Sequence, residues 1–223
     1  MLSIRLKAIA QMIPKSASRV IDVGCDHALL DIYLAKKYTN MKFLATDVNE
    51  NALSAAIKNI ETNNLQERID TKLTDGLNGI ELKKGDYIVI SGMGTKTIIS
   101  ILEKYASKVN NIIVQSNRDL ERLRSFMYKH NFYIKTEEIV LDKKYYVVIY
   151  FQKIKFACFK VKPKMLPEDY WLGPFVKKSD NKAYFLYLLQ YYEELLKTLP
   201  VFEKKAIEFE KRINYLKNLI EKK

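Results

Sequence analysis

The sequence predicts an α/β fold, in which a mostly parallel sheet is covered by helices on both faces and has an antiparallel strand at its edge. Two observations lead to this prediction. Short apolar segments alternate five times with segments of helical periodicity, and the apolar segments have no polar face. The alternation then ends in two strand-like segments, 132–140 and 144–153, which are expected to pair as a hairpin.

The expected elements follow in chain order. A short amphipathic helix that ends at Pro14 comes first. Parallel strands are expected at 20–23, 42–48, 68–76, 86–94 and 111–117. Helices are expected between them because apolar residues recur at intervals of three and four positions, as Leu53, Ala56, Ile57 and Ile60 do.

A change in composition near residue 153 divides the chain. We expect a cofactor-binding catalytic domain at 1–155 and a basic helical domain at 156–223. Residues 153–223 hold 16 basic and 9 acidic side chains, a charge of +7, whereas residues 1–152 carry 22 basic and 17 acidic, a charge of +5. Two helical stretches broken at Pro200 suggest a hairpin, and the second has the apolar spacing of a coiled coil.

Composition limits the class of protein. The net charge of +12 favours a polyanionic partner, although 31 Lys against 7 Arg is also what a biased genome would produce. The two cysteines, Cys25 and Cys158, make neither a disulfide framework nor a metal cluster. There is no apolar run of membrane-spanning length and no signal peptide. We expect a reduced, cytoplasmic, monomeric protein without a metal.

The loop after the first strand, Gly24 to His27, restricts the choice of cofactor. A dinucleotide fingerprint would place glycines where Asp26 and Leu29 stand, and a carboxylate there would repel a pyrophosphate. The Walker A pattern of a P-loop is also absent. S-adenosylmethionine carries no phosphate, and its sulfonium and amino groups are attracted by acidic side chains.

Acids at the ends of three successive strands support that cofactor. Asp22 and Asp26 suit its cationic end, Asp47 is placed for ribose hydroxyls, and Asp75 for the adenine amino group. Each acid taken alone could equally be a helix cap or a turn residue. The expected cofactor-binding residues are Asp22, Gly24, Asp26, Asp47, Asp75, Gly76 and Gly92.

The same stretches resemble a known family, the bacterial tRNA (adenine-N1)-methyltransferases called TrmK. The resemblance rests on "LSIRLKAIAQMIP", "DVGCDHALLDIYL", "TDGL", "SGMG", "QSN" and "LGPF". It implies a class I Rossmann-like methyltransferase domain, a C-terminal coiled-coil domain, S-adenosylmethionine as cofactor, no metal, and methylation of adenine 22 in tRNA. The chain departs from the family pattern at Cys25, Thr95 and Ser116.

The chemistry expected for such an enzyme assigns further roles. Asp26 would stabilise the cationic product base unless the cofactor occupies it, and His27 would contact the adenine edge or be an ordinary first-turn residue. The expected catalytic residues are Asp26, His27, Met93 and Asn117. The expected RNA contacts are Arg5, Arg118, Lys204, Lys205, Lys211 and Arg212. Since the chain has no Pro-Pro pair, the loop typical of exocyclic N6 methylation is absent.

Two other functions remain open at this point. The chain could be an RNA-binding or coiled-coil interaction module that uses a methyltransferase fold without turnover. It could also methylate a small molecule, although the basic tail speaks against this.

Overall fold

The computed structural model describes residues 2–154, 162–200 and 203–223. The chain forms two compact units, Met1–Pro174 and Phe175–Lys223. The boundary expected between residues 155 and 156 lies outside the described residues, as does Cys158.

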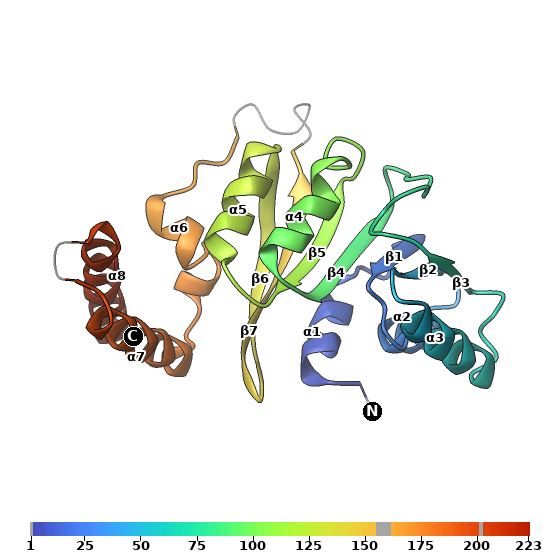
Figure 1. Ribbon diagram of the computed structural model, residues 1–223, viewed down its shortest axis with the longest axis horizontal. Coiled ribbons are helices and arrows are strands. Elements are labelled where there is room, and N and C mark those ends of the chain that lie inside the picture. The colour runs from blue at the N-terminus through green and yellow to red at the C-terminus, as the bar shows by residue number, and fades with distance from the viewer. Residues whose placement is uncertain (1, 155–161, 201–202) are drawn as a thin grey trace. The chain divides into compact units, whose positions relative to one another are not determined.

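A seven-stranded sheet forms the centre of the first unit, with the strand order β3-β2-β1-β4-β5-β7-β6 (Figure 1). The pairs β1–β2, β2–β3, β1–β4 and β4–β5 are parallel, which confirms the alternating pattern read from the sequence. The strands are β1 (Arg19–Val23), β2 (Lys42–Asp47), β3 (Ile69–Leu73), β4 (Tyr87–Met93), β5 (Asn111–Ser116), β6 (Phe132–Asp142) and β7 (Lys144–Lys153).

The closing hairpin lies at one edge of the sheet, as expected from the sequence. The antiparallel strand β7 lies one position inside the edge, between β5 and β6, and β6 forms the edge. Burial explains this order. Strand β7 has five consecutive buried residues, 147–151, whereas in β6 only Phe132 and Val140 are buried. The more apolar strand takes the inner position because it gains two neighbours there.

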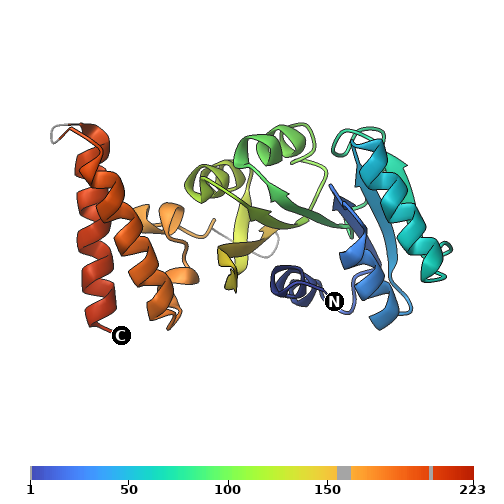
Figure 2. The same ribbon diagram turned by 60° about the horizontal axis from the view of Figure 1, so that its bottom comes forward.

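Helices cover both faces of the sheet, and they change face between β1 and β4. Helices α1 (Ile4–Met12), α2 (Leu29–Lys37) and α3 (Glu50–Thr62) share one apolar core with the strands. Helices α4 (Thr95–Glu103) and α5 (Leu120–Lys129) pack on each other on the face opposite α1 (Figure 2). Right-handed crossovers that leave in opposite directions require this change, which creates a switch point between β1 and β4.

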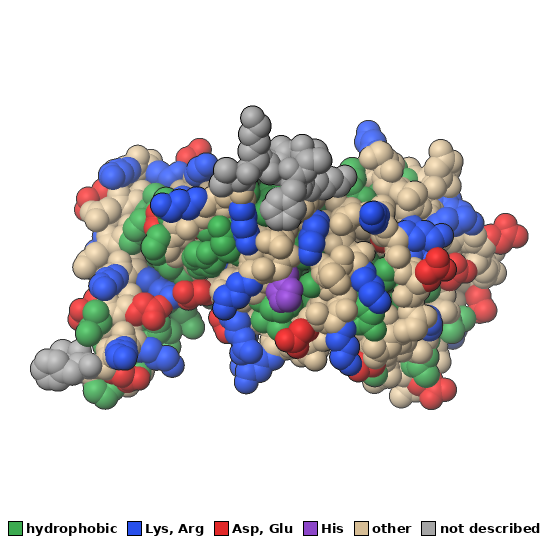
Figure 3. Space-filling model, turned by 90° about the horizontal axis from the view of Figure 1, so that it is seen from above, with side chains coloured by type: hydrophobic (Ala, Val, Ile, Leu, Met, Phe, Trp, Pro, Cys, Tyr) green, Lys and Arg blue, Asp and Glu red, His purple; other side chains and the backbone are tan. Residues whose placement is uncertain are grey.

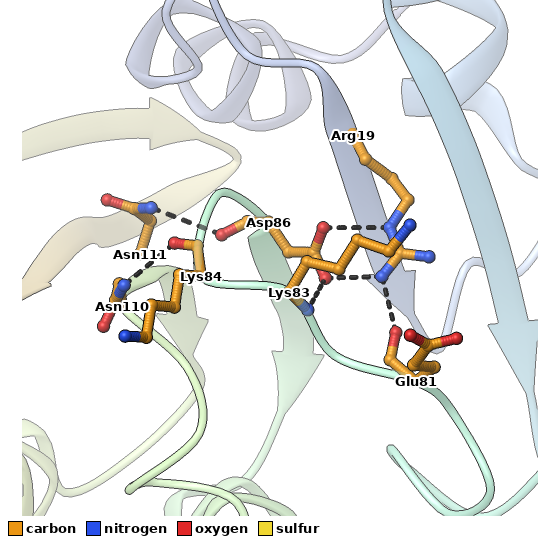
Figure 4. A network of polar contacts seen from close by, with 7 residues as sticks. All are labelled: Arg19, Glu81, Lys83, Lys84, Asp86, Asn110 and Asn111. Carbon is orange, nitrogen blue, oxygen red and sulfur yellow. Dashed lines mark hydrogen bonds and ion pairs between the residues drawn. The ribbon is translucent and has the colours of Figure 1, made fainter.

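A polar network joins the amino ends of β1, β4 and β5 (Figure 4). Two nitrogens of the Arg19 guanidinium donate to the Asp86 carboxylate, Nε at 2.9 Å and Nη2 at 2.5 Å. The backbone N–H of Lys83 also donates to Asp86, and Nδ2 of Asn111 donates to the carbonyl of Asp86. The hydrogen bond to Asp86 raises the pKa of Arg19. Asp86 is almost fully buried, so these contacts fix the entry of β4 relative to β1.

The connector that follows the hairpin is tied to the first unit by a buried arginine. Arg124 of α5 is fully buried and pairs with the buried carboxylate of Glu137 on β6 at 2.8 Å. Its remaining N–H groups donate to the carbonyls of Tyr170, Trp171 and Leu172, at the end of helix α6 (Pro167–Trp171). The connector therefore belongs to the first unit.

The second unit contains the 3-10 turn Val176–Lys178 and the helices α7 (Lys182–Lys197) and α8 (Lys204–Glu221). Tyr192 packs on Phe209, and the Lys223 amine donates to the carbonyl of Ser179 at 2.5 Å. The end of α7 thus contacts the start of α8, and the segment before α7 contacts the end of the chain. The two helices are therefore antiparallel, as expected from the sequence. Among the described residues, no helix has the length and apolar character needed to cross a membrane.

The Arg19–Asp86 network can be tested by Asp86→Ala. We expect the free energy of unfolding to fall by about 2–3 kcal/mol, because the change removes a buried charged acceptor and leaves its donors unpaired. Urea unfolding would measure it. The matched change Glu103→Ala on the exposed end of α4 should stay within about 0.5 kcal/mol of the wild type. Equal effects of the two changes would contradict a structural role for the network.

Candidate functional site

The candidate site lies at the carboxyl ends of β1 and β4, where the helices change face. Gly24 follows β1 and has a φ of +74°, a conformation that favours glycine. Its N–H and that of Cys25 both donate to the carbonyl of Thr46, at 2.8 and 2.9 Å, which holds the turn against β2. A side chain on Gly24 would collide with the methyl end of Met93 from β4. Gly24 therefore keeps the two strand ends in contact.

Asp47, at the end of β2, connects the loops that follow three strands. Its Oδ2 accepts from the N–H of Asp26 at 3.2 Å and its Oδ1 from the N–H of Asn49 at 2.9 Å. Its carbonyl accepts from the N–H of Thr74, beyond β3, at 2.9 Å. The structure thus brings Asp26 and Asp47 together, and the exposed Asp75 directly follows Thr74, whose N–H bonds Asp47.

Asp26 and His27 stand at the tip of the loop after β1. Their side chains are 75% and 51% exposed, and His27 Nε2 lies 3.6 Å from Asp26 Oδ1. Asp26 and Ala28 have positive φ values of 52° and 53°, and Nδ2 of Asn59 donates to the carbonyl of His27 at 3.1 Å. A tightly bent loop therefore presents a carboxylate and an imidazole to solvent, where both can meet a ligand.

Asp22 differs from the other acids because it is buried beside Asp31 of α2, at 6% and 0% exposure. Burial and the neighbouring carboxyl raise the pKa of Asp31 well above its usual value, and burial raises the pKa of Asp22 to about 7. No donor from another described residue pairs with the Asp31 oxygens. Asp31 is therefore the carboxyl that keeps a proton and can donate it to Asp22, since two adjacent buried carboxylates cannot both ionise.

Cys25 is also buried in this region. Burial raises the pKa of its thiol, and the charges of Asp22, Asp31 and Asp47 raise it further. A thiol in such surroundings is unreactive. The region therefore offers negative charge and backbone polar groups rather than a nucleophile.

The other side of the site is lined by amide groups at the ends of β4 and β5. Gln115 is fully buried, and its Oε1 accepts from Arg5 Nη1 at 2.9 Å and from the N–H of Gly92 at 3.1 Å. Its Nε2 donates to Asn117 Oδ1 at 3.1 Å. Asn117 Nδ2 in turn donates to the carbonyl of Gly92 at 2.7 Å. Met93, Gly92 and Asn117, all expected in the site, are therefore joined, since the N–H of Asn117 also donates to the carbonyl of Met93.

Sequence reasoning missed two residues of this site, Asp31 and Gln115. Each had a signal. Asp31 is a lone acid among apolar residues of α2, and Gln115 interrupts a strand in which every residue is buried. Gly76, expected to contact the cofactor, has a φ of +61°, and a side chain added there would lie 3.0 Å from Ile101 of α4.

The expected RNA-contacting residues are less uniform. Arg118 is exposed, whereas Arg5 is half-buried and held by Gln115. In the second unit, Lys204, Lys205 and Lys211 are exposed on α8. Arg212 does not lie on the outer face as expected, because its side chain is 11% exposed and bonds Glu208 and the hydroxyl of Tyr192. It joins α8 to α7.

The acidic groups at this end of the sheet fit a cationic cofactor that carries no phosphate. Carboxylates stand at the ends of β1 and β2, where their negative charge suits a sulfonium and an amino group. Among the described residues, no three His, Cys, Asp or Glu side chains gather as a metal site requires.

The Asp22–Asp31 pair gives the stability of the fold a pH dependence. In the folded protein Asp22 keeps its proton to about pH 7, and the pKa of Asp31 is raised as well, whereas unfolded carboxyls lose their protons at about pH 4. The stabilising contribution of the pair is therefore present at low pH and is lost as the pH rises through 7. In Asp31→Asn the side-chain amide can donate an N–H to Asp22, so no carboxyl proton has to be retained. We expect the difference in unfolding temperature, Asp31→Asn minus wild type, to be more positive at pH 8 than at pH 5. A difference that is the same at both pH values, or one that the exposed Asp70→Asn reproduces, would contradict the shared proton.

Comparisons with known proteins agree with this geometry. The family model described as "Methyltransferase domain" matches residues 2–149. A Mycoplasma genitalium protein named as a candidate tRNA methyltransferase is 29% identical over 221 residues, which is 97% of this chain and 96% of that protein.

Two solved structures are similar over almost the whole chain. The structure of M. capricolum TrmK with S-adenosyl-homocysteine has a TM-score of 0.83 and 30% identity, and the match covers 99% of this chain and 98% of that one. The B. subtilis tRNA methyltransferase TrmK, described as an M1A22 enzyme, has a TM-score of 0.82 and 25% identity, with 99% of each chain covered. The match thus includes the helical hairpin as well as the sheet. The chain belongs to the methyltransferase-domain family and, within it, to the TrmK group.

Proposed function

We propose that this protein transfers a methyl group from S-adenosylmethionine to N1 of an adenine in tRNA, at position 22. The observation that carries the proposal is the meeting of two surfaces at one switch point. The acidic loops after β1 and β2 form one side, and the amide-lined ends of β4 and β5 form the other. Relatives described as TrmK methyltransferases match both sides and the second unit.

The acidic side would hold the cofactor. Asp47 would accept hydrogen bonds from the ribose hydroxyls, as an acid at the end of the second strand does in related folds. Asp75 would accept from the adenine amino group. Asp22 and Asp26 would provide negative charge near the sulfonium and amino groups. Gly24 and Gly92 would let the cofactor approach the backbone.

The amide side would hold the target base. When bound, S-adenosylmethionine supplies an electrophilic methyl group. Transfer would form a bond between adenine N1 and the methyl carbon and break the sulfur–carbon bond, and N1 carries no proton that would have to leave first. The protein therefore contributes positioning and charge rather than a general base. Met93 and Asn117 would flank the base, and His27 would contact its edge.

Asp26 would stabilise the base as it becomes cationic. Its carboxylate is mostly exposed beside His27, so it can approach a ligand without first breaking a buried contact. A preformed negative charge near the developing positive charge lowers the barrier because little reorganisation is needed.

The tRNA would be held by phosphate contacts. N1 lies on the pairing edge of adenine, so the target must be unpaired or turned out of the helix. Exposed Arg118 and the α8 lysines Lys204, Lys205 and Lys211 are candidate contacts. In the view of Figure 3, each unit carries basic side chains interspersed with acidic ones. We place the enzyme in the cytoplasm and expect a monomer.

The activity can be tested with labelled S-adenosylmethionine and unmodified tRNA transcripts. We expect label in tRNA, located at N1 of adenine 22 by mapping of the modified nucleoside. A transcript in which adenine 22 is replaced by guanine is the matched control and should accept no label. Label at exocyclic N6 would contradict the proposed chemistry, and no label in any tRNA would overturn the proposed function.

The cofactor side can be tested by Asp47→Ala. We expect S-adenosylmethionine to bind about 10- to 100-fold more weakly by calorimetry, because hydrogen bonds to a charged acceptor contribute about 1.5–3 kcal/mol. Asp70→Ala, at an exposed position of the neighbouring strand β3, is the matched control and should bind normally. Asp47→Asn keeps one acceptor oxygen for the loop N–H groups, so its affinity for the cofactor should lie between those of Asp47→Ala and Asp70→Ala. Unchanged affinity of Asp47→Ala would remove Asp47 from the cofactor site.

A further inference from the structure

We propose that Gln115 is the positioning residue of the base-binding side. It fixes the orientation of the Asn117 amide and of the Gly92 backbone before any base arrives. The inference rests on the proposed function only in assigning Asn117 to the base. The contacts of Gln115 are independent of that assignment.

The position of Gln115 is costly unless its amide is fully used. It lies in β5, where all six residues are buried, and it is itself 0% exposed. An unpaired amide in such surroundings is strongly unfavourable. An apolar side chain of similar size would satisfy the packing without this cost. A role in the core alone therefore does not account for a glutamine at this position.

The acceptor atom of Gln115 receives hydrogen bonds from two separate elements, α1 and β4. Its Oε1 accepts from Arg5 Nη1 of helix α1 at 2.9 Å, from the N–H of Gly92 at 3.1 Å, and from the hydroxyl of Ser91 at 3.3 Å. Gly92 has a φ of +81°, which favours glycine, and the bond from its N–H to Gln115 fixes the direction of this part of the backbone. The contact also holds Arg5, whose guanidinium lies 5.3 Å from the centre of the Tyr146 ring.

The donor atom of Gln115 decides how Asn117 is turned. Gln115 Nε2 donates to Asn117 Oδ1 at 3.1 Å, and Asn117 Nδ2 donates to the Gly92 carbonyl at 2.7 Å. A flipped Asn117 amide would lose both bonds, because two donors and two acceptors would then face each other. One N–H of the exposed Asn117 side chain remains for a ligand. Gln115 thus preorganises a hydrogen-bond donor at the site.

Gln115→Glu separates the two halves of this role. The carboxylate keeps the shape and the acceptor for Arg5 and Gly92 but cannot donate to Asn117, so the Asn117 amide must turn. We expect the single-turnover rate of methyl transfer to fall 10- to 100-fold, with the affinities for cofactor and tRNA changed less than threefold. Gln152→Glu is the matched control, because Gln152 bonds Asn111 at the opposite end of the sheet, and it should keep the wild-type rate.

A double-mutant cycle distinguishes positioning from a general structural effect. Asn117→Ala removes the group on which Gln115 is proposed to act. In that background Gln115→Glu should lower the rate less than twofold further. Losses that multiply in the double variant would overturn the inference. If thermal unfolding shows that Gln115→Glu is not folded, the same cycle is measured with Gln115→Met, which also lacks the donor.

A measurement without substrate separates this inference from the proposed function. In the ligand-free protein, Gln115→Glu should shift the side-chain amide resonances of Asn117 in an NMR spectrum. The Gly92 N–H should stay protected from hydrogen exchange in Gln115→Glu but lose protection in Gln115→Met. Unchanged Asn117 resonances would overturn the inference, whatever the enzyme methylates. Wild-type protein that methylates no tRNA, with these shifts present, would overturn only the proposed function.

Discussion

Strands β1 and β4 pair in a single register, Val20 with Tyr87 and Val23 with Ile90, and the candidate site depends on this pairing. The Arg19–Asp86 pair fixes the register at the amino ends of the strands. At the other ends, the absence of a side chain on Gly24 leaves room for Met93. Because the crossovers leave in opposite directions from these two strands, the loops beyond them are free to form a site.

Hydrogen bonds from side chains to backbone shape both sides of that site. Asp47 holds the loops after β1 and β2, and Gln115 holds the end of β4. In each case a single side chain at the carboxyl end of a strand accepts from groups that are distant in sequence. Such an arrangement lowers the cost of ordering the loops when a ligand binds. It also suits a reaction in which placement of two reactants, rather than proton removal, limits the rate.

Charge is distributed unevenly around the site. Asp26 is mostly exposed, whereas Asp22 and Asp31 are buried, and burial beside one another raises the pKa of both. The buried pair therefore adds less negative charge near neutral pH than two carboxylates would. In the second unit, Arg212 joins the two helices, while Lys204, Lys205 and Lys211 of α8 are exposed. Residues of like charge thus have different roles, according to their burial.

Alternating apolar segments determined the parallel sheet, and the loop from Gly24 to His27 was enough to exclude a pyrophosphate-binding turn, because these properties depend on local spacing and charge. The helical hairpin likewise followed from periodicity and Pro200. Only the tertiary structure decided that β7 lies inside β6, that Asp31 meets Asp22, and that Gln115 reaches Arg5 across 110 positions of sequence. These contacts arise where separate elements pack together, so no local pattern encodes them.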